Sequence, residues 1–345
     1  MSSTRDGTPR LDGRTAVDTG GTDGIGFETA RRLAARGARV VVTGRDPSKG
    51  GRAAAALREA ATGDGDASFL AADFASQADV RDLAARLDRE VDRLDVFVSN
   101  AGAWFAVPGL TDDGVEETFA VNHLAPFVLV NLLSERLRET AAEAGEARVV
   151  VVSSELHRNA RMAFRKLRSV HEVTGRDAYA RSKLANVLFT FEAAERLRGT
   201  GVTANCLHPG AVLGTSLSRE YGGAVRAAVS VLDTLPDSFT SRFAKSVAEG
   251  ADTSVYLAAS PEVEGVTGEY FADCAVERPS ATARDERTRR RLWTVSADLT
   301  DLSPDEQIPP RSAGGAEWAA ETGTETEVET GTEAGTGTSG GNRSQ

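Results

Sequence analysis

The feature that most constrains this chain is the alternation of apolar, β-branched runs with helical patterns through most of its length. Unbroken apolar runs, such as Val40–Val42 and Val149–Val152, are typical of strands that are buried on both faces. Strands that alternate with helices form parallel sheets, because each helix carries the chain back to the same end of the sheet. We therefore predict an α/β fold, a doubly wound parallel β-sheet with helices on both faces, in a single domain.

The periodicities predict the following elements. The strands are Thr15–Val17, Arg39–Thr43, Ser68–Ala71, Val96–Ser99, Arg148–Ser153, Val202–Leu207 and Glu269–Phe271. The helices are Ile25–Arg36, Arg52–Ala61, Val80–Val91, Val115–Thr140, Ala178–Arg198 and Ser246–Ala259. Leu156–Asp177 lacks a clear period and is predicted to be a long loop, while Leu217–Lys245 fits either a mobile helical flap or ordinary core packing.

Composition divides the chain into three parts. Residues 1–10 are polar and are predicted to be disordered, and residues 11–299 are predicted to form the folded domain. Residues 300–345 are an acidic, Gly-, Thr- and Glu-rich tail with little to bury, which we also expect to be disordered. The net charge is −11, and nine acidic and two basic residues in 301–345 account for −7 of it.

The same composition argues against several classes of function. An acidic chain is a poor partner for nucleic acid, and two distant cysteines, Cys206 and Cys274, form neither a disulfide framework nor a metal site. There is no run of eighteen apolar residues, so we expect no membrane span. The polar N-terminus lacks the apolar stretch of a signal peptide, so the expected location is cytoplasmic.

A glycine-rich loop follows the first predicted strand and opens the first predicted helix. Glycines at this point allow a tight turn and let the backbone approach a pyrophosphate, which then lies at the helix N-terminus. The position in the first strand–helix unit predicts a nucleotide site on a sheet of the Rossmann type. The predicted contacts are Gly20, Thr22, Asp23, Gly24, Ile25 and Gly26.

The end of the second strand discriminates between the two nicotinamide cofactors. A carboxylate there binds the ribose 2′-hydroxyl of NAD, whereas an arginine accommodates the 2′-phosphate of NADP. Arg45 comes first and Gly44 leaves room beside it. Asp46 precedes Pro47 and is better interpreted as a helix N-cap. We therefore predict NADP as the cofactor, in preference to NAD.

Further polar residues follow the third, fourth and fifth strands. Asp73 and the segment Asn100–Ala101–Gly102 fall at carboxyl ends of strands, where an open parallel sheet binds its ligand. Ser154 follows the fifth strand, and Tyr179 and Lys183 lie four residues apart on one face of the next helix. A cation stabilises the phenolate and lowers the pKa of a tyrosine, which can then act as a general acid or base. By itself, however, such a pair is more often a solvated helix face.

Taken in order, these motifs resemble those of the short-chain dehydrogenase/reductase family over about residues 11–299. The resemblance rests on Thr19–Gly26, Asn100–Gly102, Asn122, Ser154, Tyr179–Lys183 and Pro209–Gly210. The retinol-dehydrogenase-like branch is closer still, through Gly44–Arg45–Asp46 with Lys49–Gly50, Ser182–Phe189, Leu207–Gly210 and the step of twenty-five residues from Ser154 to Tyr179.

The resemblance implies an oxidoreductase that interconverts an alcohol with a ketone or aldehyde by hydride transfer. Tyr179 would be the general acid or base, Lys183 would lower its pKa and bind the nicotinamide ribose, and Ser154 would orient the substrate oxygen. Asn122 would hold a water that relays protons. Pro209, Gly210 and Val212 would line the nicotinamide amide. The implied substrate is a small lipophilic alcohol or carbonyl compound, and the implied assembly is a homodimer or homotetramer built on the long helices.

The chain departs from the family pattern at four places. Asp18 stands where an apolar residue usually ends the first strand, so it must be paired, protonated or partly solvated. Asp23 puts a negative charge in the phosphate loop, Ser99 replaces an Asn, and Gly214 stands where many members have Thr. Asp18 and Asp23 leave open the alternative of an idle nucleotide-binding regulatory protein. A reductase of carbon–carbon double bonds on the same fold is a second alternative, because the fold does not fix the function.

Overall fold

The computed structural model describes residues 10–212 and 245–311. The predicted disorder of residues 1–9 and 312–345, the predicted flap up to residue 244, and Gly214 lie outside the described residues. Within the described residues, the part up to Pro310 belongs to one compact unit.

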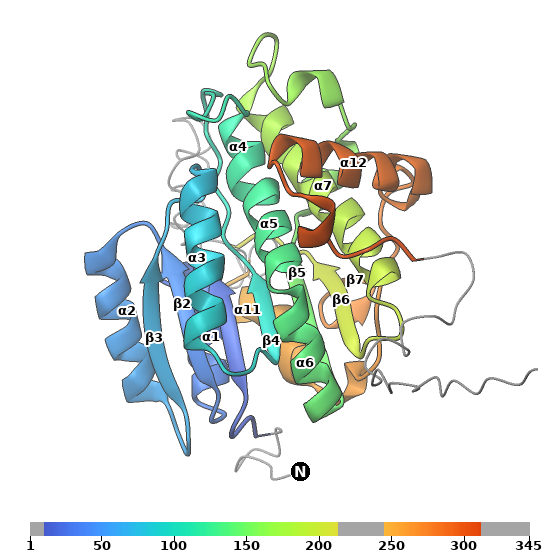
Figure 1. The fold of residues 1–345 in the computed structure, drawn as a ribbon. Helices are drawn as coiled ribbons and strands as arrows, with labels where there is room; N and C mark the ends of the chain where they lie inside the picture. The colour runs from blue at the N-terminus through green and yellow to red at the C-terminus, as the bar shows by residue number, and fades with distance from the viewer. Residues whose placement is uncertain (1–9, 213–244, 312–345) are drawn as a thin grey trace, which may run out of the picture. The chain divides into compact units, whose positions relative to one another are not determined.

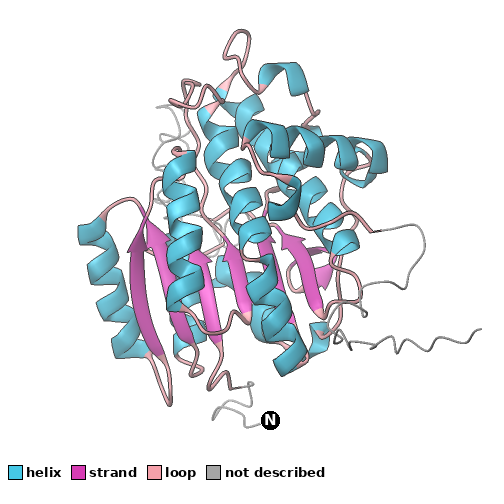
Figure 2. Ribbon diagram, viewed as in Figure 1, coloured by secondary structure: helices cyan, strands magenta, loops and turns pink. Residues whose placement is uncertain are grey.

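One sheet of eight strands runs through this unit in the order β3-β2-β1-β4-β5-β6-β7-β8 (Figures 1 and 2). Neighbouring strands are parallel as far as β7, and β8 is antiparallel to β7. The strands are β1 Thr15–Thr19, β2 Arg39–Gly44, β3 Asp66–Ala71, β4 Val96–Ser99, β5 Ala147–Val152, β6 Val202–Leu207, β7 Tyr270–Ala272 and β8 Ala275–Val276. The predicted fold class is confirmed, and β8 is an addition at the sheet edge that no sequence pattern indicated.

Helices cover both faces of the sheet, as Figure 1 shows. Side chains alternate along β1, so Ala16 packs into one apolar cluster and Val17 into the other. The Ala16 face is covered by α1 Gly24–Ala34, α2 Pro47–Ala60 and α11 Val247–Ala259. The Val17 face is covered by α3 Gln77–Glu90, α5 Ala125–Leu132, α6 Ser134–Ala144 and α7 Gly175–Arg196. α7 is buried along most of its length, partly because α12 (Glu286–Leu299) packs against it.

The helix predicted over Val115–Thr140 is not continuous. It consists of a short α4 (Glu117–Phe119), a π-helical turn over Ala120–Leu124, then α5 and α6. Leu133, with φ −93° and ψ 4°, separates α5 from α6. The apolar period of the two helices is nearly in phase across this break, which is why the sequence suggested one helix. A π-turn is frequently found at functional sites, and this one contains Asn122.

The body of the protein also extends beyond the predicted boundary at residue 299. Leu302 and Ile308 are buried, and the backbone N–H of Ile308 donates to Oδ1 of Asn131 at 2.8 Å. α12, which the periodicity did not predict, is held by a hydrogen bond of 2.8 Å between His123 Nε2 and Ser296 Oγ. The prediction that the disordered tail starts at residue 300 is therefore wrong for residues 300–310.

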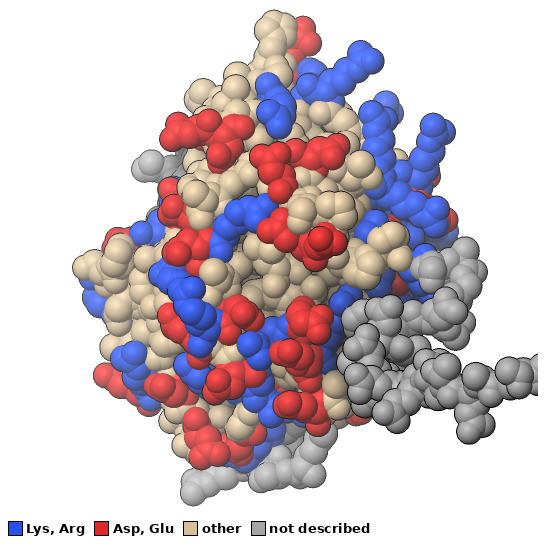
Figure 3. All heavy atoms as spheres, in the orientation of Figure 1, with Lys and Arg blue, Asp and Glu red and all other residues tan. Residues whose placement is uncertain are grey.

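Charged side chains are interspersed over most of the face seen in Figure 3, and basic ones gather beside α12. Arg136 of α6, for example, pairs with Asp88 of α3 at 3.3 Å and with Glu139 of its own helix at 2.9 Å. Such exposed pairs contribute little stability each. Among the described residues, no helix is both long enough and apolar enough to cross a membrane.

Candidate active site

The carboxyl ends of the parallel strands meet at one edge of the sheet, where the described residues enclose an open cleft. Most of the predicted cofactor-binding residues line this cleft: Gly20, Thr22, Asp23, Gly24, Ile25, Gly26, Arg45, Asp73, Asn100, Ala101, Gly102, Tyr179, Lys183 and Pro209. These residues come from segments up to about 190 positions apart in the chain. The topology therefore assembles the predicted motifs into one site.

The glycine loop is shaped for close contact. Gly20 has φ +75°, and a Cβ atom there would lie 2.9 Å from Cα of Ala101. A Cβ atom at Gly26 would lie 2.2 Å from Nδ2 of Asn100. The amide of Asn100 donates instead to the carbonyl of Thr19 at 3.1 Å, which links the ends of β1 and β4. The loop therefore requires glycine where it packs on the fourth strand, and its backbone stays open to the cleft.

The negative charge of Asp23 is paired within the protein. Its Oδ1 accepts the backbone N–H of Gly24 at 2.8 Å, so the residue caps α1, and its Oδ2 lies 2.8 Å from Nζ of Lys49. Lys49 also lines the cleft. The ammonium offsets the carboxylate that otherwise would repel a pyrophosphate, and it adds a cation beside Arg45.

The turn after β2 is arranged as the sequence predicted. Asp46 accepts the backbone N–H groups of Ser48 and Lys49 at 2.8 and 3.1 Å, and these hydrogen bonds lower the pKa of its carboxyl group. Asp46 is therefore occupied as the N-cap of α2. Arg45 is exposed at the mouth of the cleft.

Asp73 follows β3, the edge strand that lies next to β2. Its Oδ1 accepts the backbone N–H of Ala75 at 3.0 Å, and its own N–H donates to Asp79 at 3.2 Å. These contacts fix the turn and leave Asp73 in the lining of the cleft.

Tyr179 and Lys183 lie on the face of α7 that meets the cleft. Tyr179 is almost fully buried, and the Lys183 ammonium lies 5.7 Å from the centroid of its ring. The ammonium donates to the carbonyl of Val152 at 2.9 Å, and burial lowers the pKa of Lys183 to about 8. The pair is thus a buried phenol beside a buried cation, not a solvated helix face. The indole of Trp104 stacks on the Tyr179 ring, with centroids 4.7 Å apart and planes inclined by 28°.

The two serines after β5 have different partners. Ser153 is buried, lines the cleft, and donates its hydroxyl to the carbonyl of Lys183 at 2.8 Å. Ser154 is partly exposed and its Oγ accepts the backbone N–H of Leu156 at 3.3 Å. Ser154 is not part of the cleft lining, but unlike Ser153 its hydroxyl proton has no acceptor among the described residues.

Asn122 lies behind the cleft rather than in its lining. Its side chain is fully buried in the π-turn, where Oδ1 accepts the N–H of Ala103 at 2.7 Å and Nδ2 donates to the carbonyl of Ala103 at 3.0 Å. Nδ2 also donates to Oγ of Ser182 at 3.0 Å. A Cβ atom at Gly102 would lie 3.4 Å from Nζ of Lys183 and 3.6 Å from Oδ1 of Asn122. Asn122 is therefore next to Lys183, and it ties the strand β4 end to α7.

Two of the predicted nicotinamide contacts, Gly210 and Val212, are not in the lining of the cleft. Gly210 has φ +83° and faces the side chain of Lys245, and Val212 forms a parallel bridge with Lys245. Val212 also lies near Ile25, since a Cβ atom at Gly250 would touch both side chains. The segment that follows β6 therefore continues past Pro209 and approaches the glycine loop at Ile25.

Several lining residues were not among the predicted contacts: Thr43, Gly44, Lys49, Ala72, Phe74, Ala103, Phe105, Val121, Val152 and Ser153. Most of them are sequence neighbours of predicted residues at strand ends. The position of each strand end could therefore have indicated them from the sequence. Lys49 was recognised as part of the turn after β2 but was not predicted to contact the cofactor, because its approach to Asp23 depends on how α2 packs beside α1.

Of the three alternatives for Asp18, paired, protonated or partly solvated, the structure favours the protonated one. Both of its oxygens are buried without a hydrogen-bond partner among the described residues, and burial raises the pKa of its carboxyl group well above the ordinary value. Its strand neighbours are Val42 and Val98. Asp18 is therefore an unpaired carboxyl group inside an apolar layer, where burial favours its neutral form, away from the cleft lining.

Comparison with known proteins agrees with this geometry. The family model described as short chain dehydrogenase matches residues 14–224. Retinol dehydrogenase 14 of Mus musculus is 41% identical over 301 residues, which cover 85% of this chain and 87% of that protein. Dehydrogenase/reductase SDR family member 13 of Bos taurus is 41% identical over 304 residues, covering 87% of this chain and 76% of that protein.

Solved structures show the same architecture. An uncharacterized protein from Mycobacterium paratuberculosis is 31% identical with a TM-score of 0.65, covering 87% of this chain and 98% of that one. The Pseudomonas aeruginosa RhlG/NADP active-site complex is 26% identical with a TM-score of 0.61, covering 76% and 95%.

Proposed function

The chain belongs to the short-chain dehydrogenase family, in its retinol-dehydrogenase-like branch, and from this premise we propose that it is an NADP-dependent alcohol dehydrogenase or carbonyl reductase. The observation that carries the proposal is the placement of Tyr179 beside buried Lys183 at the edge of a glycine-loop cleft. A buried phenol next to a cation, at a dinucleotide-type cleft, is suited to proton transfer coupled to hydride transfer.

The residues of the cleft fit a dinucleotide. The backbone at Gly20 and Gly26 leaves no room for side chains, the N-terminus of α1 faces the cleft, and Lys49 balances the charge of Asp23. Such an N-terminus stabilises a pyrophosphate. When bound, the nicotinamide would supply the hydride.

The preference for NADP is supported by Arg45 at the end of β2. Arg45 is exposed there without an ion pair among the described residues, whereas Lys49, one helical turn further on, already pairs with Asp23. The nearest carboxylate in the turn, Asp46, is held as the α2 cap through its Oδ1, which accepts the N–H groups of Ser48 and Lys49. A guanidinium binds a phosphate through paired, charge-assisted hydrogen bonds.

The proposed substrate is a small or medium lipophilic alcohol or carbonyl compound. Trp104 stacks on Tyr179, and Phe105 lines the cleft next to it. Beyond them, Val107 and Leu110 expose apolar side chains on the same segment, with exposed fractions of 83% and 44%. The names of the retinol dehydrogenases denote a lipophilic alcohol, which agrees with an apolar approach to Tyr179.

In the reductive direction, the hydroxyl of Tyr179 donates its proton to the carbonyl oxygen of the substrate. In the oxidative direction the phenolate removes the proton of the alcohol. The Lys183 ammonium stabilises the phenolate electrostatically. The free hydroxyl proton of Ser154 donates a hydrogen bond to the substrate oxygen, and Asn122 holds the segment around Ala103 and the start of α7 in register.

The test is a titration of the full chain with NADPH and NADH, followed by a screen of aldehydes and ketones for NADPH oxidation. We expect NADPH to bind more tightly than NADH and at least one lipophilic carbonyl compound to be reduced. If neither nucleotide bound, the oxidoreductase proposal would be refuted. Equal affinity for both would refute the role of Arg45, and nucleotide binding without turnover of any carbonyl or alkene would favour the idle regulatory protein.

A further inference from the structure

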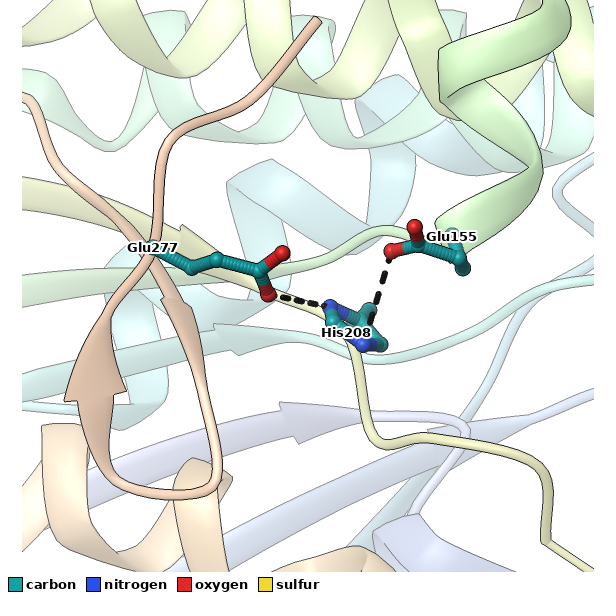
Figure 4. Close-up of side chains that lie close together, drawn as sticks. All are labelled: Glu155, His208 and Glu277. Atoms are coloured by element: carbon teal, nitrogen blue, oxygen red, sulfur yellow. Dashed lines mark ion pairs between the residues drawn. The ribbon is translucent and has the colours of Figure 1, made fainter. Parts of the chain in front are cut away.

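His208 lies between two carboxylates beside the proposed active site (Figure 4). It directly follows β6 and precedes Pro209, which lines the cleft. Its Nε2 is 3.6 Å from Glu155, the residue after Ser154, and its Nδ1 is 3.9 Å from Glu277. The group therefore connects the segment that carries Ser154 to the segment that carries Pro209.

This arrangement is a charge cluster. The two carboxylates lie beside different nitrogens of the imidazole ring, and one side-chain N or O atom of each of the three residues lies within 4.8 Å of the others. Arg158 already pairs with the remaining oxygens of both Glu155 and Glu277. Both carboxylates are therefore already paired with a cation of the protein, the guanidinium of Arg158.

Hydrogen bonds around His157 determine where its proton lies. The backbone N–H of Ser280, which can only donate, points at His157 Nε2 at 3.2 Å. Because Nε2 accepts this N–H, it carries no proton of its own, and the single proton of the buried ring is on Nδ1. That proton is donated to the carbonyl oxygen of Ser154 at 2.9 Å.

The same reasoning places the next two protons. The hydroxyl of buried Tyr270 lies 3.4 Å from His157 Nδ1, which is a donor, and 2.8 Å from His208 Nδ1. Tyr270 must therefore donate its proton to His208, whose own proton is then on Nε2, on the side of Glu155. One ordered chain of hydrogen bonds runs from Ser154 through His157 and Tyr270 to His208.

We propose that His208 is a positioning residue, which in its neutral form holds the Ser154 and Pro209 segments together through Tyr270 and His157. A second proton on His208 would turn Nδ1 into a donor, so the Tyr270 oxygen would have to accept this hydrogen bond and the Tyr270 proton would need another acceptor. The Tyr270 proton could not move to His157 Nδ1, since that atom also donates. The imidazolium would instead be drawn towards Glu155 and Glu277, and the Pro209 segment would lose its hydrogen-bonded anchor.

The surrounding charges oppose one another. Burial lowers the pKa of His208, the carboxylates of Glu155, Glu277 and Asp273 raise it, and the guanidinium of Arg158 lowers it. Lys245 pairs with Asp273 and reduces the influence of that carboxylate. The expected consequence is weaker binding of the nucleotide at acid pH, because Pro209 lines the cleft.

The proton positions can be tested without any activity. The chain has four histidines, and long-range nitrogen–proton NMR of the full chain labelled at histidine distinguishes the tautomers, with single His→Asn variants for assignment. At pH 7.5 we expect His157 to carry its proton on Nδ1 and His208 on Nε2. A His208 ring protonated on Nδ1 at that pH, alone or together with Nε2, would overturn the proposal.

The functional part rests on the proposed function only in its use of NADPH as ligand. We expect His208→Asn, which keeps an acceptor for Tyr270 but cannot take a second proton, to bind NADPH at pH 7.5 within about twofold of the wild type. His208→Leu, which removes the acceptor, should bind about fivefold more weakly, as expected for one lost buried hydrogen bond. Unchanged binding by His208→Leu would overturn the proposal.

The pH dependence provides the sharper comparison. The 2′-phosphate of NADPH itself titrates near pH ~6. The test is therefore the difference between the proteins in how much NADPH affinity they lose on acidification. Between pH 7.5 and 5.5, the wild type and the control His171→Asn, at an exposed histidine, should lose more affinity than His208→Asn. Equal losses in all three proteins would overturn the proposal. If no protein bound NADPH, the proposed function would fail, while the tautomer result would still decide the hydrogen-bond chain.

Discussion

Replacement of Asp18 by valine is expected to stabilise the protein, and increasingly so as the pH rises. Asp18 is fully buried in β1, its strand neighbours are Val42 and Val98, and neither oxygen has a partner among the described residues. Burial raises the pKa of its carboxyl group well above the ordinary value, so the folded protein holds a proton that the unfolded chain releases.

The size of the stability effect follows from the free energy needed to keep the Asp18 carboxyl group protonated. A carboxyl group with an ordinary pKa of about 3.9 costs about 1.4 kcal/mol per pH unit to keep protonated above that value. Between that value and the raised folded-state pKa, the cost therefore grows with each pH unit, against the ~5–15 kcal/mol that usually separates folded from unfolded states. Because the folded-state pKa is raised, this contribution is absent below pH ~4 and the free energy of unfolding falls as the pH rises towards the folded-state pKa.

Urea denaturation of the wild type and Asp18→Val at pH 5, 6, 7 and 8 measures the effect. The stability advantage of the variant should grow with pH, at about 1.4 kcal/mol per pH unit, until the pH reaches the folded-state pKa of Asp18. Asp18→Asn has nearly the same shape and cannot ionise, so it should show the same growth with a smaller absolute gain, because its amide remains unpaired. An advantage that does not change with pH, or a loss of stability in Asp18→Val at pH 7, would refute the reasoning.

Three further predictions concern the active site. Arg45→Ser should weaken NADPH binding about 10–100-fold, as expected for lost charge-assisted hydrogen bonds, and leave NADH binding nearly unchanged; a parallel loss for both nucleotides in fluorescence titrations would contradict this. Trp104→Leu should raise KM for lipophilic carbonyl compounds about 2–10-fold, since an aromatic contact contributes ~0.5–1.5 kcal/mol, whereas Trp104→Phe should retain most of it. The rate of carbonyl reduction should fall above about pH 8, where Lys183, whose pKa burial lowers to about 8, loses the proton that supports Tyr179; a rate that stays constant up to pH 10 would count against that role.

The features that sequence alone could predict are those encoded within short stretches of chain. The spacing of the glycine loop, the four-residue step from Tyr179 to Lys183 and the cap formed by Asp46 depend on local geometry, and the structure places all three as expected. The parallel arrangement of the strands followed from the rule that parallel strands are joined by crossover helices.

The features that escaped prediction depend on residues far apart in the chain. Lys49 meets Asp23 only because α2 packs beside α1, and Trp104 reaches Tyr179 only once the β4 end lies against α7. Ile308 is buried because Asn131 of α5 accepts its N–H, which no pattern near residue 308 could indicate. Neutral Asp18 was one of three sequence-based alternatives, and its lack of a partner was visible only in the packed sheet.

The central claim, that Tyr179 transfers the proton during NADPH-dependent carbonyl reduction, has a direct test. NADPH deuterated at its hydride-donating carbon is incubated with the best carbonyl compound from the screen, and the product is examined by NMR. We expect deuterium on the carbinol carbon with the wild type. Tyr179→Phe should form product about 10²–10⁴-fold more slowly, the usual contribution of a general acid, while it still binds NADPH. The account would be contradicted if the deuterium were found on a carbon of a reduced carbon–carbon double bond. It would also be contradicted if Tyr179→Phe turned over as fast as the wild type.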